Sequence, residues 1–519
     1  MTTPDSARGG VRVTGTELTV EDVVAVARGG ADAALSASAV ETMRHSAQVT
    51  AELAQSLDAV YGVSTGFGSL STVRIAAEHR EELQRALIRS HAAGMGERVE
   101  REVVRAMMLL RVRSLSMGHS GTRTLVAETM LAMLNAGLTP VVPRYGSVGA
   151  SGDLAPLAHC ALALIGEGEV TGPDGETGPA AAALAQAGIE PVTLTAKEGL
   201  ALINGTDGML AMLALATHDL ARMLSSADIA AAMSVEALMG TDRAFAEDLV
   251  ALRPQPGQAD SAANLRHLLA GSAIIASHRH DDPRVQDAYS LRCAPQVVGA
   301  ARDTLAFADG VVANELRSAI DNPIILPDGR VESCGNFHGA PLAFACDFLA
   351  IAAAEVGAIA ERRTDRLLDP ARSQGLPPFL APEAGVNSGL MISQYTQAAM
   401  VAENRRLATP ASVGSLPTSA MQEDHVSMGW GAACKLRVVV ENLVRIVAIE
   451  CVAAARAIEL RAPLQPAAGT AAAVARLRAA GIPAAGPDRW LAPDLAAAER
   501  LVGDGGLLVA VQERVGPLR

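Results

Sequence analysis

Apolar residues recur at steps of three or four positions along two long stretches in the second half of the chain. One stripe, within residues 341–368, consists of Leu342, Ala345, Leu349, Ala352, Val356 and Ile359. The other, within residues 427–460, consists of Leu436, Val440, Leu443, Val447, Cys451, Ala454 and Ile458. This spacing puts every member of a stripe on one face of an α-helix. The two patterns predict long helices in a bundle, with apolar surface left to be buried against other subunits.

Weaker patterns of the same kind predict further helices at 20–57 (two, separated by Gly29-Gly30), 81–91, 103–116, 124–135, 204–239, 303–320, 471–480 and 492–502. A small polar insert covers residues 165–195. The expected fold class is mainly α, a long-helix bundle with a mixed N-terminal region. We expect a disordered lead over residues 1–20, an N-terminal domain over 21–200, a central long-helix bundle over 201–465 and a C-terminal helical cap over 466–519.

Composition supports this fold and narrows the partners. Aromatic residues make up only 3% of the 519 residues while apolar residues make up 50%, so small aliphatic side chains must fill a closely packed helical core. The net charge is −13 and no basic block occurs, which disfavours nucleic acid and anionic membranes as partners. The polar N-terminus lacks the layout of a signal peptide, so we expect a soluble, cytoplasmic protein.

Cysteine and histidine usage argues against a metal site. The six cysteines are scattered without a Cys-x-x-Cys pair, which is typical of reduced, mostly buried thiols. Residues 278–282, His-Arg-His-Asp-Asp, resemble a ligand cluster, but contiguous polar residues are more typical of a solvated loop. We therefore expect no metal.

The candidate chemistry lies in residues 149–157, Gly-Ala-Ser-Gly-Asp-Leu-Ala-Pro-Leu. The Gly152 nitrogen can attack the Ala150 carbonyl carbon, and loss of water, including the Ser151 hydroxyl, leaves an electrophile built from the backbone. Glycine permits the close approach that this ring needs. Taken alone, the same residues are also typical of an ordinary turn. A phosphate loop would need Gly-Lys-Ser/Thr and a nucleophile elbow Gly-x-Ser-x-Gly, and neither spacing fits.

Other blocks make the combination specific: residues 61–68, 90–96, 204–206, 286–296, 321–323, 335–338 and 422–428. With residues 149–157 they closely resemble the aromatic amino acid ammonia-lyase family, and within it the lyases that act on histidine. The resemblance extends from about residue 20 to 460. It implies a 4-methylidene-imidazol-5-one (MIO) prosthetic group formed autocatalytically from Ala150, Ser151 and Gly152, with no external cofactor. It also implies a homotetramer with active sites shared between subunits.

The resemblance also implies roles for single residues. Tyr61 would be the base that removes the β-proton, and Asp153 would assist cyclisation. Arg292 would hold the substrate carboxylate. Hydrogen bonds around the prosthetic group and the amino-acid end of the substrate would come from Asn204, Gln286 and Tyr289. Phe337 would pack beside the prosthetic group. Two departures, Ser64 and Ala288 in place of the family's usual asparagine and proline, affect loop rigidity and remove no group with an assigned role.

His91 and Glu423 carry the expected substrate preference. His91 lies where the family contacts the substrate ring, and Glu423 can accept a hydrogen bond from an imidazole. A phenyl ring would leave that buried carboxylate unpaired. The resemblance thus implies elimination of ammonia from L-histidine to give trans-urocanate, the opening step of histidine breakdown. Because some tyrosine enzymes also use a histidine here, His91 alone leaves a tyrosine or phenylalanine ammonia-lyase or aminomutase as the alternative.

Two other classes of protein remain as competing hypotheses. An inert helical scaffold would keep the fold without losing water from the triplet. The helical fumarase and aspartase-type lyases carry a Ser-Ser-x-Met-Pro-x-Lys-x-Asn loop, which this sequence lacks.

Overall fold

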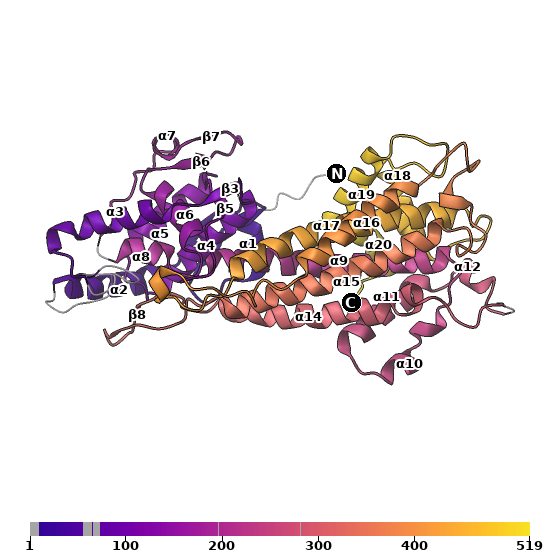
Figure 1. Ribbon diagram of the computed structural model, residues 1–519, viewed down its shortest axis with the longest axis horizontal. Helices are drawn as coiled ribbons and strands as arrows, with labels where there is room; N and C mark the ends of the chain where they lie inside the picture. Colours follow the sequence, from indigo (N-terminus) through magenta and orange to yellow (C-terminus); the bar gives the residue numbers. More distant parts are fainter. Residues whose placement is uncertain (1–9, 56–64, 66–72, 196, 281) are drawn as a thin grey trace. The chain divides into compact units, whose positions relative to one another are not determined.

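The computed structural model describes residues 10–55, 65, 73–195, 197–280 and 282–519, and helices dominate it (Figure 1). The chain forms two compact units. The first unit comprises Met1–Leu215, Asp309–Cys346 and Pro410–Cys434, and the second comprises Ala216–Ala308, Asp347–Thr409 and Lys435–Arg519. Four of the boundaries fall inside long helices: α9 (Asp207–Ala237), α14 (Ala294–Glu315), α15 (Ala340–Leu368) and α17 (Gly429–Glu459). The observed units therefore interleave along the chain, unlike the four consecutive segments expected from the sequence.

The first unit is built around α4 (Arg101–Ser116), which is buried on all sides from Val103 onward. Three of its buried residues, Arg105, Arg111 and Arg113, are charged, and their guanidinium groups donate to backbone carbonyl oxygens within the unit. Helices α1 (Val20–Ala27), α2 (Ala37–Gln55) and α5 (Thr124–Asn135) contact it. The remaining helices of this unit's N-terminal part are α3 (Arg80–His91), α6 (Leu154–Leu164), α7 (Ala180–Gln186) and α8 (Glu198–Ile203).

The strands of the first unit are short. β3 (Met95–Arg98) pairs antiparallel with β5 (Pro143–Tyr145), and β4 (Thr139–Pro140), β6 (Glu169–Thr171) and β7 (Thr177–Pro179) form a three-stranded sheet in the order β4-β6-β7. The hairpin β8 (Ile324–Ile325) and β9 (Val331–Glu332) lies close to the candidate site in sequence. These pairings account for the mixed character of the N-terminal region.

Part of the expected disordered lead is ordered. Residues Val11–Val13 form β1, which pairs in parallel with β2 (Ala33–Leu35). Both valines are buried, and a capping box between Thr19 and Asp22 begins α1 directly afterwards. The prediction was wrong here because a three-residue strand gains its stability from a partner about twenty residues away, which local patterning does not reveal.

The second unit is a helical bundle. In it, α15 and α17 pack with α16 (Met391–Leu407) through Ala360, Val401 and Ile446. A fully buried ion pair joins Arg363 on α15 to Glu450 on α17. The other helices of this unit are α10 (Glu247–Ala251), α11 (Pro256–Leu269), α12 (Ala273–Ala276), α13 (Tyr289–Arg292), α18 (Ala468–Ala479), α19 (Ala492–Gly503) and α20 (Gly506–Val515). The bundle of long helices expected from the two apolar stripes is therefore present.

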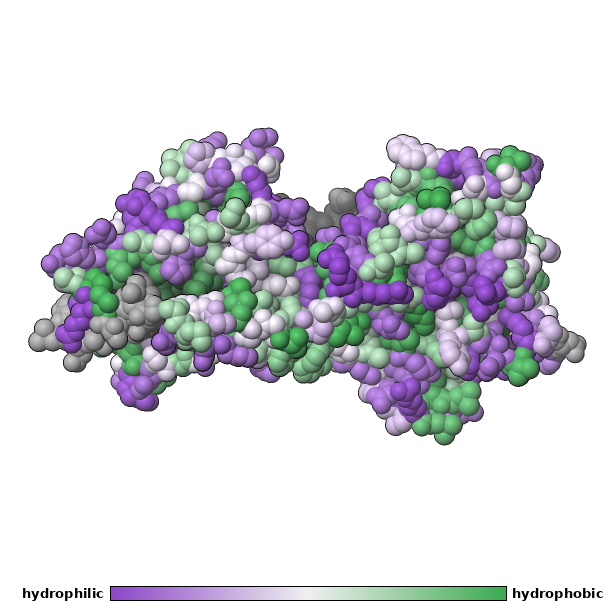
Figure 2. Space-filling view, viewed as in Figure 1, coloured by the Kyte–Doolittle hydropathy of each residue, from purple (hydrophilic) through white to green (hydrophobic). Residues whose placement is uncertain are grey.

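One described helix, α15, is long and apolar enough to cross a membrane by length and composition alone. Of its most apolar window, 56% is buried inside the protein, as in a core helix. On the face drawn in Figure 2, apolar and polar residues are interspersed over the surface.

Candidate active site

The Ala-Ser-Gly triplet lies in a tight loop between β5 and α6. Gly149, Ser151 and Gly152 have positive φ angles of 82°, 51° and 82°. For Ser151 this backbone conformation is strained, at a cost of about 1–2 kcal/mol. A Cβ atom on Gly152 would overlap the carbonyl group of Gly205, and Asp153 N donates to that same carbonyl at 2.8 Å. Only glycine therefore fits at position 152 of this loop.

Asp153 ends this loop and is fully buried. Its Oδ2 accepts hydrogen bonds from the backbone N–H groups of Gly208 and Met209, at 2.8 and 3.0 Å, in the first turn of α9. Its Oδ1 has no hydrogen-bond partner among the described residues. Burial raises the pKa of Asp153 to about 8, against the effect of the two backbone donors. The raised pKa favours the neutral acid at pH 7, and Oδ1 is the oxygen on which a proton could act as a hydrogen-bond donor beside the triplet.

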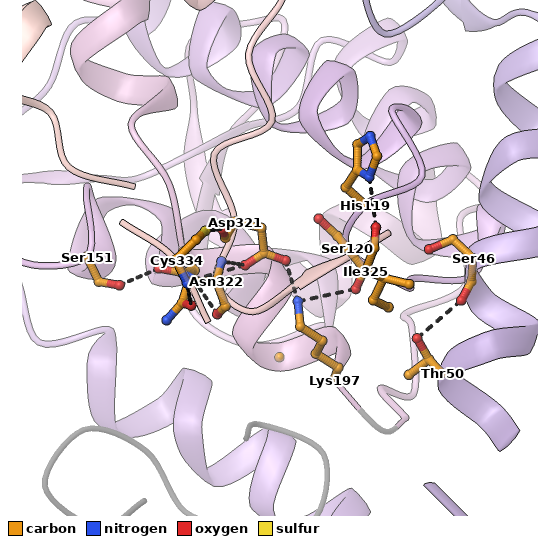
Figure 3. A network of polar contacts seen from close by, with 12 residues as sticks. Ser46, Thr50, His119, Ser120, Ser151, Lys197, Asp321, Asn322, Ile325 and Cys334 are labelled. Atoms are coloured by element: carbon orange, nitrogen blue, oxygen red, sulfur yellow. Dashed lines mark hydrogen bonds and ion pairs between the residues drawn. The ribbon is translucent and has the colours of Figure 1, made fainter. Parts of the chain in front are cut away.

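Asn204 connects the triplet to a buried polar network; Figure 3 labels Ser151, Asp321 and Lys197 of this network. Its Oδ1 accepts a hydrogen bond from the Ser151 hydroxyl, and its Nδ2 donates to Asp321 Oδ1 at 2.9 Å. Asp321 forms a buried ion pair with Lys197, whose Nζ also lies 3.4 Å from the carbonyl oxygen of Ser120. The Ser151 hydroxyl thus donates to the Asn204 amide, whose orientation is in turn held by its hydrogen bond to Asp321.

Sequence reasoning missed the residues behind Asn204. Arg111 is fully buried, donates to the backbone carbonyl of Asn204 at 2.7 Å and pairs with Asp207 at 3.1 Å. Lys197 and Asp321 lie 124 residues apart in sequence, and although Asp321 falls in the block 321–323, no role was predicted for either residue. A signal was present nevertheless, because Lys197 is one of only two lysines in a chain whose other basic residues are all arginine.

His91, the last residue of α3, is half-buried. Its Nδ1 lies 2.9 Å from the Leu87 carbonyl oxygen, which can only accept, so Nδ1 carries the proton and Nε2 is left as an acceptor. Burial lowers the pKa of His91, and the carboxylate of Glu423 acts in the opposite direction. The first unit therefore brings His91 within electrostatic reach of Glu423, as the substrate hypothesis requires.

The loop that presents Glu423 is strained. Between Thr418 and Glu423, the three residues Ser419, Ala420 and Met421 have φ angles of 49°, 52° and 72°. Thr418 closes the loop through its N–H to Glu423 O at 2.8 Å and its hydroxyl to Glu423 Oε2 at 2.7 Å. Backbone strain of this kind is concentrated at functional sites, and here it fixes the position of a carboxylate.

Phe337 is half-buried in the turn that precedes α15. The next residue, His338, stacks on His425, with ring centroids 5.8 Å apart and planes 3° from parallel. The stack brings together the segments that carry Phe337 and Glu423, which are more than eighty residues apart in sequence.

Gln286, Tyr289 and Arg292 belong to the second unit. The Arg292 guanidinium carbon lies 4.6 Å from the centre of the Tyr289 ring, and its Nε donates to the Asp287 carbonyl at 3.0 Å. All three residues line a pocket of about 380 Å³ together with Arg284, Arg366 and Arg372. Asp287 also lines it, and Arg284 and Arg372 are paired with aspartates, but the excess of arginines over carboxylates in the lining still suits an anionic group. Tyr61 lies outside the described residues.

Among the described residues, no group of three or more histidine, cysteine, aspartate or glutamate side chains could hold a metal ion. His278, in the segment considered above, has both ring nitrogens near backbone carbonyl oxygens, at 3.0 and 3.1 Å. That ring is used for structure.

A family model described as aromatic amino acid lyase matches residues 18–479. The chain belongs to this family. Histidine ammonia-lyases from Streptomyces avermitilis and Streptomyces griseus are each 62% identical to it, over 96% of this chain and 98% of each relative. Among solved structures, the family includes tyrosine aminomutase from Streptomyces globisporus, with a TM-score of 0.93 at 38% identity, covering 98% of this chain and 100% of that one.

The histidine ammonia-lyase from Trypanosoma cruzi is similarly close in structure, with a TM-score of 0.90 at 40% identity, covering 97% of this chain and 95% of that one. These likenesses confirm the mainly α fold class. They also confirm the resemblance drawn from the sequence blocks.

Proposed function

We propose that the protein eliminates ammonia from L-histidine to give trans-urocanate, as the opening step of histidine breakdown. The observation that supports the substrate is that Glu423, held by Thr418 at the end of its loop, lies within electrostatic reach of His91. An imidazole N–H can donate to the Glu423 carboxylate while the other imidazole nitrogen, when protonated, can donate to His91 Nε2. A phenyl ring offers no hydrogen-bond donor and a phenol ring only one, so the half-buried Glu423 carboxylate, which already accepts from Thr418, would gain fewer hydrogen bonds from such a substrate.

The triplet and its surroundings fit the MIO group of the family. Gly152 is crowded against Gly205, the Ser151 hydroxyl donates to Asn204, and Asp153 Oδ1 has no hydrogen-bond partner among the described residues. We therefore assign MIO formation to Ala150, Ser151 and Gly152, with no external cofactor. Once formed, the group supplies an electrophile that makes the amino group of the substrate a better leaving group.

The remaining roles concern binding and proton removal. Arg292 uses Nε on the Asp287 carbonyl, so its two terminal nitrogens can bind the substrate carboxylate in a bidentate manner. Tyr289 and Gln286 in the same pocket, with Asn204 and Phe337 in the first unit, are assigned to the amino-acid end and the prosthetic group. Tyr61 is assigned as the base for the β-proton from the sequence resemblance alone.

A homotetramer with shared sites explains two exposed features of the second unit. Tyr289 is 71% exposed in the single chain, although its proposed role needs an enclosed site. An apolar groove of about 650 Å³ between α14 and α15 is lined by Phe307, Phe348 and Ile351, each about half exposed. Burial of both against other copies is the arrangement that we propose, in a cytoplasmic enzyme with neither nucleic acid nor membrane as partner.

The test is to incubate the purified protein separately with L-histidine, L-tyrosine and L-phenylalanine and to follow the ultraviolet absorbance of each unsaturated acid. Urocanate from histidine alone is expected. The alternative, a tyrosine or phenylalanine ammonia-lyase or aminomutase, is favoured by the structural likeness to tyrosine aminomutase. Coumarate, cinnamate or a β-amino acid as the main product would establish that alternative.

A further inference from the structure

A continuous chain of buried contacts runs from the Ser151 hydroxyl through Asn204 and Asp321 to Lys197 (Figure 3). We infer that Lys197 and Asp321 are positioning residues: they hold the Asn204 amide in the orientation that binds the Ser151 hydroxyl, and thereby set the rate at which the triplet is converted. This inference rests on the proposed formation of MIO from the triplet.

The choice of lysine at position 197 is unusual for this chain. Only two lysines occur in 519 residues, and all other basic residues are arginine. Lys197 is 0% exposed at its side chain and its partner Asp321 is 3% exposed. A buried ammonium is stable only with a close counter-ion and hydrogen-bond acceptors, which Asp321 and the Ser120 carbonyl supply. The compact ammonium fits this space, whereas a planar guanidinium presents a wider and differently shaped set of donors.

Asp321 transmits the position of Lys197 to Asn204. One carboxylate oxygen, Oδ2, contacts the ammonium, and the other, Oδ1, accepts from Asn204 Nδ2 at 2.9 Å and from the Asn322 backbone N–H at 2.7 Å. A carboxylate paired with an ammonium accepts hydrogen bonds and donates none. Asn204 must therefore turn its NH₂ group, and not its oxygen, toward Asp321.

This constraint determines what Asn204 offers to the triplet. The second hydrogen of Nδ2 is also used, because Nδ2 donates to the Asn322 carbonyl oxygen at 2.7 Å. Rotating the amide by 180° would break both bonds and place an oxygen against two acceptors. Only the oxygen of Asn204 remains to face the triplet, where it accepts from the Ser151 hydroxyl. Lys197 thus acts on the orientation of the Ser151 hydroxyl, which must leave as water, through two intermediate residues, Asp321 and Asn204.

The other lysine provides a matched control. Lys435 pairs with Asp347 in the second unit and donates to the Thr409 carbonyl, with 11% and 1% of the two side chains exposed. It is the same kind of buried ion pair with the same kind of carbonyl acceptor. Lys435 and Asp347 have no contact with Asn204 or Ser151 in the described hydrogen-bond network. Removing either lysine therefore destabilises the fold through loss of a similar buried ion pair, but only removal of Lys197 should affect the triplet.

The experiment follows the mass of the peptide that spans residues 150–152, sampled over time after synthesis of the full-length chain. The variants are Asp321→Asn, Lys197→Met and Lys197→Arg, with Asp347→Asn and Lys435→Met as controls, and thermal melting of each is recorded. In the wild type the peptide should lose two waters. We expect conversion to slow by about tenfold or more in the Asp321 and Lys197 variants, and to keep the wild-type rate in both controls.

Each outcome separates the two claims. A wild-type peptide that keeps both waters would overturn the proposed prosthetic group itself. Wild-type conversion together with an equal rate in folded Asp321→Asn or Lys197→Met would overturn the positioning role only. If those two variants do not fold, Lys197→Arg decides by the same criterion, because it keeps the charge and changes only the shape of the donor. Equal slowing in the Lys435 and Asp347 controls would also contradict the inference, since it would trace the effect to general destabilisation.

Discussion

Thr418 holds the carboxylate of Glu423 by a hydrogen bond of 2.7 Å from its hydroxyl to Oε2, at the end of a loop with three consecutive residues of positive φ. The same carboxylate lies within electrostatic reach of His91. The position of the proposed substrate-binding carboxylate therefore depends on Thr418, and the contribution of this hydrogen bond to substrate binding can be measured.

Replacing Thr418 by valine removes the hydroxyl while keeping the side-chain shape. The KM for L-histidine should rise about fivefold, because a typical hydrogen bond contributes about 1 kcal/mol. Steady-state kinetics on the two proteins measure the change. Thr396→Val is the control, since that hydroxyl bonds only to Ile392 within its own helix, at 3.1 Å. Equal KM values for wild type and Thr418→Val would show that Glu423 does not need this support.

Gly152→Ala should abolish conversion of the triplet. The added Cβ would overlap the Gly205 carbonyl, and the φ angle of 82° is unfavourable for alanine. Gly175→Ala controls for the second effect, because Gly175 has a φ of 85° and nothing within 4 Å of the added atom. Mass spectrometry of the triplet peptide should show two waters retained in the first variant and lost in the control. Conversion in both would contradict the crowding argument.

The buried carboxyl of Asp153 should make stability depend on pH. Its pKa is raised to about 8 in the fold, mainly by burial, above the ordinary value of 3.8. Between those values the folded state binds more protons than the unfolded state, so this group's stability is complete below about pH 4 and is lost as pH rises through 8. In thermal melts, the melting temperature of Asp153→Asn relative to that of the wild type should rise between pH 5 and pH 8.

The exposed pair Asp328 and Arg330 gives the opposite sign for comparison. The Arg330 guanidinium lowers the pKa of Asp328, so any contribution to stability is fully present above about pH 4 and is lost as pH falls below that value. Asp328→Asn should therefore show no gain toward pH 8. A constant difference in melting temperature between Asp153→Asn and the wild type would contradict a neutral buried acid.

The apolar groove of the second unit should be needed for assembly. Phe307 and Phe348 lie 5.9 Å apart between ring centres, and both are about half exposed. Phe348→Glu puts a charge there, so sedimentation velocity should show smaller species with reduced activity. Leu252→Glu, at a site 82% exposed and outside the groove, should remain a tetramer. A smaller species with full specific activity would contradict shared active sites.

Local patterning predicted the elements that local forces specify. The sequence-based bounds 124–135 and 341–368 differ from α5 and α15 by at most one residue. A helix was predicted at 303–320, but α14 begins at Ala294. Proline is unfavourable inside a helix but is tolerated in its first turn, which is where Pro295 lies. The helix also ends earlier, at Glu315.

The candidate site divides in the same way. The triplet, Asn204, His91 and Glu423 could be predicted from the sequence because each lies in a motif that is readable along the chain. The Lys197 and Asp321 pair was not, because the two residues become partners only when segments 124 residues apart fold together. The positive φ angles of Ser419, Ala420 and Met421 could not be predicted either, because serine, alanine and methionine rarely adopt the left-handed conformation.

The most direct test of the account is the substrate preference of Glu423→Gln, with Asp424→Asn, its exposed neighbour, as control. The substitution keeps the size of the side chain and removes the charge that accepts from an imidazole. The account predicts that kcat/KM for L-histidine falls by about tenfold to a hundredfold, while activity on L-phenylalanine does not fall and the control behaves as the wild type. An unchanged rate with L-histidine would contradict it and would favour an aromatic ammonia-lyase or aminomutase.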